Sequence, residues 1–254
     1  MPTQISEYEI RSFTAPADNG LFITHDVYSR GTHHKKVVVI IQELPGIGQE
    51  TLALADRFFA NDYCVVLPHL FGPLGKKAPA RNFAHICISR EYHVFASKKS
   101  SPVVDWLRSL CQKLRDEYDV DGIATIGMCL TGSFAISLMA DDAVLAGFAS
   151  QPSLPFHSQK GLHINEEEIQ KIKDKLDIVG PMQAGRFKRD WICREKKFKA
   201  IEETFNDDGQ ERIKFHRPAG RKHSILTIHY NDDPGSPTRT TLDEVMAYFD
   251  RVLE

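Results

Sequence analysis

The segment that decides the fold reads Ile123-Ala-Thr-Ile-Gly127-Met128-Cys129-Leu130-Thr131-Gly132. An apolar run leads into a turn of small residues and then into a helical pattern, with Cys129 at the tip of the predicted bend. Small residues such as Gly127 and Gly132 let the strand and the helix approach closely. N–H groups at the start of the helix stabilise negative charge on a thiolate or an oxyanion. The pattern therefore indicates a nucleophile elbow rather than a buried structural cysteine.

Strand and helix patterns alternate on both sides of this bend. The β-branched run over residues 36–42 is typical of a strand that is covered on both faces in a parallel sheet. The expected strands are 8–13, 21–27, 36–42, 65–67, 123–126, 144–149, 179–184 and 212–216, and the expected helices are 52–59, 103–114, 130–138, 165–175, 196–205 and 242–253. This alternation predicts an α/β fold with a mostly parallel central sheet and helices on both faces, in a single domain over residues 1–254. Residues 72–93 show no clear period and are expected to form a cap or substrate loop.

Composition and charge exclude several classes of protein. Over 254 residues, 32 basic and 34 acidic side chains nearly cancel, which gives no steering toward nucleic acid or an anionic membrane surface. No apolar run reaches the ~20 residues of a membrane-spanning helix, and the N-terminus lacks the pattern of a secretory signal. The 5 cysteines are scattered and form no C-x-x-C pair, which argues against a zinc ribbon and a disulfide scaffold. We therefore expect a cytoplasmic protein with free thiols and with neither a nucleic-acid nor a membrane partner.

A cysteine nucleophile needs a general base, and the base needs a carboxylate that orients it. Where the nucleophile sits on an elbow, the acid and then the histidine follow it along the chain. Asp190 follows the strand expected at 179–184, and His223 lies between the last expected strand and the last helix. The competing candidates are His216 and His229 for the base, and Asp177 and Asp207 for the acid. His216 falls inside an expected strand and Asp177 precedes its strand, so both rank lower.

Three segments of the chain together resemble the dienelactone hydrolases of the α/β-hydrolase superfamily. Residues 37–46 contain Gln42-Glu43 at the end of a strand and before a glycine, as in that family. The elbow at 127–132 is similar to the family's Gly-x-Cys-Leu-Gly-Gly, and Asp190 and His223 come late in the chain as the family's acid and base do. The resemblance spans about residues 37–223 and implies an α/β-hydrolase fold.

The resemblance also implies a role for each matching residue. Cys129 is the nucleophile, His223 the general base and then acid, and Asp190 the residue that fixes the imidazole. The backbone N–H groups of Leu44 and Leu130 form the oxyanion hole. Glu43 matches a glutamate that holds the resting thiol until substrate binds, and a nearby carboxylate does disfavour a second negative charge. The implied reaction is hydrolysis of a small-molecule ester or lactone through a thioester acyl-enzyme, without a metal or an organic cofactor.

Two departures from the family pattern bear on the substrate. Thr131 stands where the family usually has glycine, which crowds the elbow. The family clamps a substrate carboxylate with arginines, one of them shortly after the histidine, but residues 224–227 contain none. Arg90 and Arg221 are the candidate substrate-binding residues that could supply cationic contacts. An ester, lactone or thioester of another acid is therefore as well supported as the diene lactone.

Two alternatives to a hydrolase stay open. One is a non-catalytic protein of the same fold that binds or senses a small molecule. The other is a redox-sensing thiol at Cys129, with Cys193 as its resolving partner. The presence of Cys129, Asp190 and His223 in this order argues against the first, because a binding protein has no need of all three.

Overall fold

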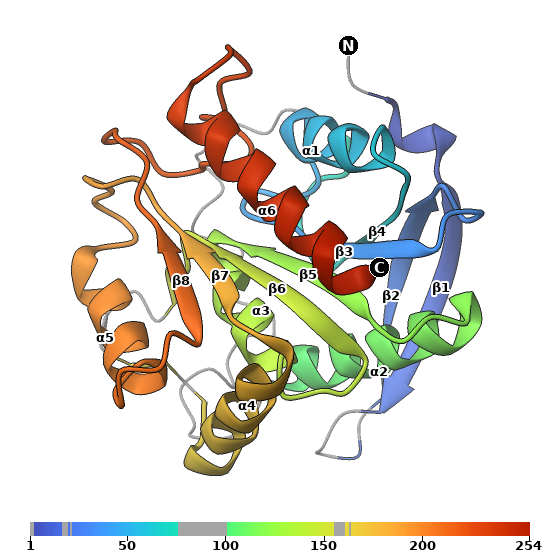
Figure 1. Cartoon of the computed structure of the whole chain (residues 1–254). Helices are drawn as coiled ribbons and strands as arrows, with labels where there is room; N and C mark the ends of the chain where they lie inside the picture. The colour runs from blue at the N-terminus through green and yellow to red at the C-terminus, as the bar shows by residue number, and fades with distance from the viewer. Residues whose placement is uncertain (1–2, 17–19, 21, 76–100, 155–160, 163) are drawn as a thin grey trace.

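The described part of the chain, residues 3–16, 20, 22–75, 101–154, 161–162 and 164–254, folds around one sheet of eight strands in this computed structural model (Figure 1). The strands are β1 (Glu9–Pro16), β2 (Phe22–Arg30), β3 (Lys36–Ile41), β4 (Tyr63–His69), β5 (Ile123–Met128), β6 (Val144–Ser150), β7 (Met182–Gly185) and β8 (Ile213–His216). Their order across the sheet is β1-β2-β4-β3-β5-β6-β7-β8. β2 runs antiparallel to β1 and β4, and the other neighbouring strands are parallel. The predicted α/β fold with a mostly parallel sheet is confirmed.

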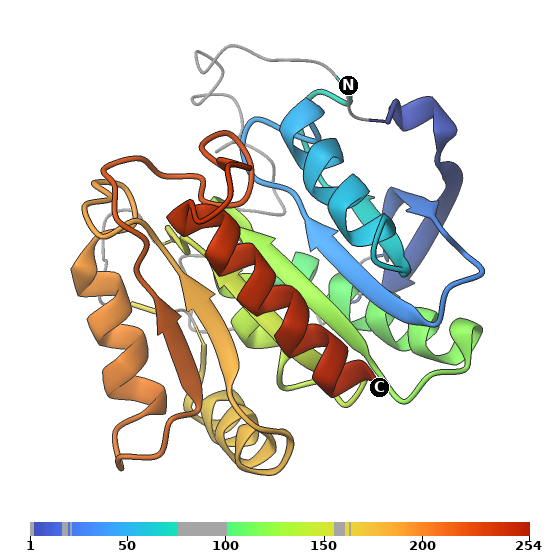
Figure 2. The ribbon, with the colours of Figure 1, turned by 45° about the horizontal axis from the view of Figure 1, so that its top comes forward.

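Helices cover both faces of the sheet, as Figure 2 shows. The helices are α1 (Gln49–Phe59), α2 (Pro102–Tyr118), α3 (Gly132–Leu138), α4 (Glu166–Val179), α5 (Glu195–Phe205) and α6 (Pro237–Leu253), with single 3₁₀ turns at η1 (Ile5–Glu7) and η5 (Cys129–Thr131). Apolar residues of α1 and α6 belong to the core on one face, and those of α2, α3, α4 and α5 to the core on the other. Among the described helices, none combines the length and the apolar character that crossing a bilayer requires.

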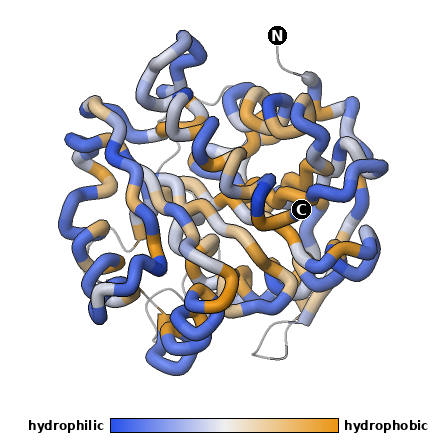
Figure 3. Tube along the Cα trace, in the orientation of Figure 1, coloured by the Kyte–Doolittle hydropathy of each residue, from blue (hydrophilic) through white to orange (hydrophobic). Residues whose placement is uncertain are grey.

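The central strand β3 shows why its sequence forms a strand covered on both sides. Val37, Val39 and Ile41 pack into one core, and Val38 and Ile40 pack into the other. All five side chains are fully buried. This is the period of two that a strand imposes on successive side chains. In Figure 3, hydrophobic residues gather on the strands at the centre of the molecule, and hydrophilic segments lie around them.

The predicted boundary between α4 and β7 is wrong. The sequence favoured a strand over 179–184 after a helix ending near 175, but α4 continues through Val179 and β7 begins only at Met182. Gly180, with φ 90°, ends the helix by donating its N–H to the carbonyl of Leu176. Glycine adopts this φ without a steric penalty, so it terminates the helix here. The cap or substrate loop expected at 72–93 lies outside the described residues from position 76 onward.

The parallel strands bring five chemically active side chains to one edge of the sheet. Glu43 follows β3, Cys129 follows β5, Gln151 follows β6, Asp190 follows β7 and His223 follows β8. Because these strands are parallel, their carboxyl ends meet at the same edge, which is where open α/β sheets bind their ligands. The four cysteines in the described segments are all buried and free, as expected for a chain without a disulfide scaffold.

Candidate active site

Cys129 occupies a strained bend between β5 and α3. Its φ is 55°, in the left-handed region that side chains other than glycine rarely adopt. The close approach within the bend requires glycine at two positions. A Cβ on Gly127 would lie 2.2 Å from the carbonyl oxygen of Thr131, and one on Gly132 would lie 2.7 Å from the Cα of Pro152. Backbone strain of this kind clusters at functional sites, which supports the predicted nucleophile elbow.

Gly127→Ala is expected to lower the free energy of unfolding by about 1–3 kcal/mol, because backbone atoms of the elbow must shift to admit the new Cβ. Urea unfolding measures this loss. Gly209→Ala is a comparison variant of the opposite kind: its φ of +84° strains an alanine, but among the described residues the added Cβ would meet nothing within 4 Å. This variant therefore reports only the backbone cost of a substituted glycine. A free energy of unfolding of Gly127→Ala equal to that of the natural protein would contradict the steric argument.

The structure brings Asp190 and His223 together as predicted. His223 Nδ1 donates a hydrogen bond of 2.7 Å to Oδ2 of Asp190. The other carboxylate oxygen, Oδ1, accepts the backbone N–H groups of Ile192 at 2.8 Å and Cys193 at 3.0 Å. The Asp190 side chain is fully buried, so its orientation is fixed on both sides. The contact selects the imidazole tautomer that carries its proton on Nδ1 and leaves Nε2 for the thiol.

The thiol of Cys129 lies near the other side of the imidazole. Nε2 of His223 is buried and has no hydrogen-bond partner within the described part of the chain. Burial lowers the pKa of His223, but the Asp190 hydrogen bond and the neighbouring Cys129 thiol together outweigh burial and raise this pKa to about 10. Cys129 itself is 4% exposed. The cysteine, the histidine and the aspartate thus meet at the carboxyl edge of the sheet.

The competing acid and base candidates are engaged elsewhere or make structural contacts. His216 Nε2 lies 2.7 Å from Oε1 of Gln183, within the sheet. Asp177 pairs with Arg212 and Asp207 pairs with Lys173 on the outer surface. His229 lies close to the site, but its Nδ1 accepts the backbone N–H of Ser224 at 3.2 Å. These contacts leave His223 and Asp190 as the pair with the geometry of a base and its orienting acid.

Glu43 is buried at the end of β3 and is bound by three side chains. Its Oε2 accepts the Ser224 hydroxyl at 2.8 Å and the Gln151 amide at 3.3 Å, and its Oε1 accepts the Thr227 hydroxyl. Burial raises the pKa of Glu43, while these three donors and the nearby charge of His223 oppose that rise. These hydrogen bonds fasten the carboxyl group to the segment that follows His223 and do not join it to the Cys129 thiol. The sequence pointed to Glu43 but not to Gln151, Ser224 or Thr227.

A second group that the sequence did not single out is Arg186. Its guanidinium is 2% exposed and donates to the carbonyl of Phe187 at 2.7 Å. It also pairs with Glu195 at the start of α5. A buried cation that binds backbone carbonyls holds the loop leading to Asp190 in place. The only sequence signal was its position in the run that connects β7 to Asp190.

The other predicted residues are those of the oxyanion hole, Leu44 and Leu130, and the candidate substrate-binding arginines. Leu130 follows Cys129 in the first turn after the elbow, and Leu44 follows Glu43, so both backbone amides belong to the segments that flank the thiol. Arg221 is exposed at the surface. Arg90 lies outside the described residues. Within the described ranges, no group of three or more His, Cys, Asp or Glu side chains could hold a metal ion.

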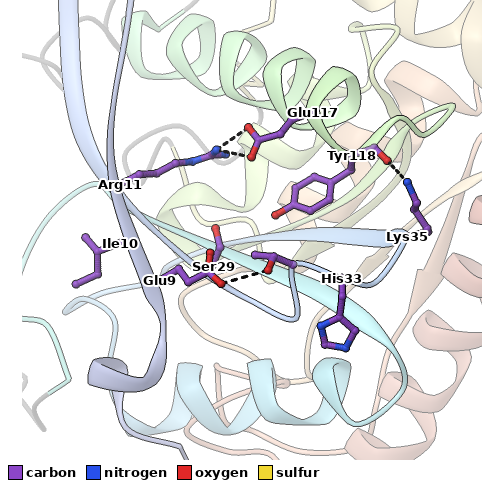
Figure 4. Close-up of a pocket in the computed structure, with 9 residues that line it drawn as sticks. Glu9, Ile10, Arg11, Ser29, His33, Lys35, Glu117 and Tyr118 are labelled. Carbon is purple, nitrogen blue, oxygen red and sulfur yellow. Dashed lines mark hydrogen bonds and ion pairs between the residues drawn. The ribbon is translucent and has the colours of Figure 1, made fainter.

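A polar pocket lies at a different place in the fold, as Figure 4 shows. It has a volume of about 340 Å³ and lies between β1, the end of β2 and the end of α2. Its charged groups already have partners: Arg11 pairs with Glu117 at 2.6 Å, Lys35 donates to the Tyr118 carbonyl at 2.7 Å, and Glu9 accepts the Thr32 hydroxyl at 3.2 Å. Such internal pairing is typical of a structural surface, and neither Cys129 nor Asp190 nor His223 lines this pocket.

Comparisons with known proteins agree with the fold. The model of the dienelactone hydrolase family matches residues 25–249. The fold is similar to an esterase from Pyrococcus furiosus (TM-score 0.63, 12% identity, covering 100% of this chain and 98% of that one). It is also similar to a dienelactone hydrolase-like promiscuous phosphotriesterase from metagenomic libraries (TM-score 0.62, 14% identity, 97% and 99% covered) and to the esterase domain of a Rhodothermus marinus protein (0.56, 13%, 97% and 100%). No curated protein sequence matches the chain. At these identities the structural likeness establishes the fold alone.

Proposed function

The chain belongs to the dienelactone hydrolase family, and from this premise we propose that it hydrolyses carboxylic esters or lactones with Cys129 as the nucleophile. The observation that carries the proposal is the 2.7 Å hydrogen bond from His223 to Asp190, with the Cys129 thiol beside the imidazole as a second group that raises its pKa. A base oriented by a buried carboxylate and adjacent to a nucleophile is the arrangement that acyl transfer needs.

The proposed reaction has two halves. His223 Nε2 takes the proton of the Cys129 thiol, and the thiolate attacks the carbonyl carbon of the substrate. The N–H groups of Leu44 and Leu130 bind the resulting oxyanion. The bond to the leaving oxygen breaks, His223 returns the proton to that oxygen, and a thioester remains. Water then gives a proton to His223 and attacks the thioester, which releases the acid and restores the thiol.

The charges of the site support this order of proton transfers. The negative charge of the Cys129 thiolate is one of the causes that raise the pKa of His223 to about 10, so the imidazole holds the proton firmly while the thiolate exists. Acylation removes that negative charge. The pKa of His223 therefore falls at the step where the leaving group needs a proton, and the neutral imidazole can then serve as the base for water.

A thiolate favours substrates with an activated leaving group. Enol lactones, aryl esters and thioesters qualify better than amides, because expelling an amine needs stronger acid assistance. The described part of the site places Ser224 and Thr227 where the sequence lacks the family's post-histidine arginine, and both hydroxyls bind Glu43. The proposal therefore covers small esters and lactones without requiring a carboxylate on the substrate.

p-Nitrophenyl acetate tests the proposal directly. We expect intact-protein and peptide mass spectrometry to find an acetyl group on Cys129 that appears within the first turnover and disappears as the substrate is consumed. A non-catalytic binding protein would give no adduct at this residue, and an acetyl group confined to other residues would reject the mechanism. The redox alternative instead predicts a disulfide between Cys129 and Cys193 under mild peroxide. Burial raises the pKa of Cys193 well above its usual range, which makes this thiol a poor resolving nucleophile.

Glu43 acts in this proposal through its charge and through its anchoring of the His223 segment. Glu43→Gln removes the charge, so the pH profile of Cys129 alkylation by iodoacetamide is expected to move to lower pH, because the thiolate loses a neighbouring negative group. The same change places an amide N–H₂ among three donors and is expected to lower the free energy of unfolding by about 1–3 kcal/mol. An unchanged alkylation profile would show that Glu43 does not hold the resting thiol.

A further inference from the structure

Thr131, the residue that departs from the family's elbow pattern, has a fully buried side chain at the junction of two strands. Its hydroxyl oxygen accepts the backbone N–H of Met128 at 2.9 Å. The same oxygen lies 3.1 Å from the carbonyl oxygens of Ile41, Gln42 and Met128. One hydroxyl thus joins the end of β3 to the elbow that follows β5.

The Thr131 hydroxyl lies at the point where the backbone pairing of β3 with β5 ends. The parallel pairing of β3 with β5 ends at Ile41 and Gly127, where β5 turns into the elbow. Beyond that pair, the Met128 N–H can no longer meet a β3 carbonyl directly. A hydroxyl both accepts and donates a hydrogen bond, so Thr131 takes the N–H from one strand and donates to a carbonyl of the other. It extends the ladder by one step through a side chain.

We infer that Thr131 is a positioning residue that fixes the spacing between the two halves of the oxyanion hole. Leu130, which carries one of the two proposed N–H donors, is its immediate neighbour. Leu44 carries the other proposed N–H donor. It lies two residues after Gln42, whose carbonyl oxygen is within hydrogen-bond distance of the Thr131 hydroxyl. Thr131 itself is buried beneath the elbow and is not assigned a contact with substrate. This inference rests on the proposed acyl transfer, because an oxyanion hole has a role only in that reaction.

Acylation and alkylation of the Cys129 thiol differ in whether they need the oxyanion donors. Acylation by p-nitrophenyl acetate passes through an oxyanion that both N–H groups must bind. Alkylation by iodoacetamide displaces iodide from carbon and forms no oxyanion, so it reports only the reactivity of the thiolate. A change in the spacing of the oxyanion donors therefore slows the first reaction and spares the second.

The experiment compares single-turnover acylation with alkylation of Cys129 in the natural protein, Thr131→Val and Thr131→Ser. Valine keeps the shape of threonine but removes the hydroxyl, and we expect acylation to slow by at least about tenfold because displaced oxyanion donors lose much of their effect. We expect its alkylation rate to stay within about twofold, because the thiolate needs no oxyanion donor. Serine keeps the hydroxyl, so its acylation rate is expected within about threefold of the natural rate.

Three results would overturn the inference: equal slowing of both reactions in Thr131→Val, no slowing of acylation, or a serine variant as slow as the valine variant. Should Thr131→Val not fold, Thr131→Ala removes the hydroxyl together with the γ-methyl group and provides the same comparison of the two rates. The outcome is distinct from failure of the proposed function, because in that case the natural protein itself would show no acetyl group on Cys129.

Discussion

Cys129→Ala is expected to reduce kcat for p-nitrophenyl acetate by about 10⁴-fold or more, to the level of the reaction without a nucleophile. The remaining groups, His223 with Asp190 and the two backbone amides, can still bind substrate but have no atom to acylate. Steady-state release of p-nitrophenolate measures the loss. Loss of the thiolate also removes one of the causes that raise the pKa of His223, so this pKa is expected to fall in the variant.

The fold should survive this change. Alanine carries the same Cβ as cysteine, so the backbone strain at φ 55° is unaltered, and only one sulfur atom is removed. Cys111→Ala is the matched control, because Cys111 is a fully buried free cysteine in α2 and no part of the proposed site. It loses the same atom and should keep its activity. Turnover by Cys129→Ala close to that of Cys111→Ala would contradict the assignment of the nucleophile.

The local features of the fold could be predicted from the sequence because each depends on a short run of neighbouring residues. The run of β-branched residues at 36–42 has the composition of a doubly covered strand, and the structure buries all its apolar side chains. The segment 123–132 combines an apolar strand with small residues at the turn, and steric contacts at Gly127 explain why glycine is needed there. In each case the relevant interaction lies within a few residues of the chain.

The partners of buried polar groups could not be predicted in the same way. Glu43 binds Ser224 and Thr227, which lie 181 and 184 residues further along the chain. Thr131 binds the carbonyl of Ile41, 90 residues before it. Such contacts depend on how parallel strands meet at one edge of the sheet, and no local period encodes them. The α4–β7 boundary was misplaced for a related reason, because the apolar residue Val179 fits the end of a helix as well as the start of a strand.

The candidate site is built from buried side chains whose hydrogen-bond partners are fixed. Asp190 is held by two backbone amides, Glu43 by three side-chain donors, and the elbow by the Thr131 hydroxyl. Groups held in this way need little reorganisation when charge develops during the reaction, which is the general source of electrostatic catalysis. It follows that a substitution which keeps the packing but reverses the hydrogen bond to His223 should harm activity far more than stability.

Asp190→Asn is the sharpest case of such a reversal, and we expect it to lower kcat by about 10³–10⁴-fold with little loss of structure. The asparagine oxygen can still accept the N–H groups of Ile192 and Cys193. Its N–H₂ group then faces His223 Nδ1, which can remain hydrogen-bonded only as an acceptor. The imidazole proton moves to Nε2, and that nitrogen can no longer take the proton of the Cys129 thiol.

The variant also removes the Asp190 contact that helps to raise the pKa of His223, so the pKa measured by NMR titration of this histidine should fall. Asp177→Asn is the matched control, because it neutralises a carboxylate that pairs with Arg212 away from the thiol. The control should keep its activity and the pKa of His223, while its contact with Arg212 loses the charge of one partner. If Asp190→Asn turned over substrate within about tenfold of the Asp177→Asn rate, the tautomer set by Asp190 would not be what makes His223 a base.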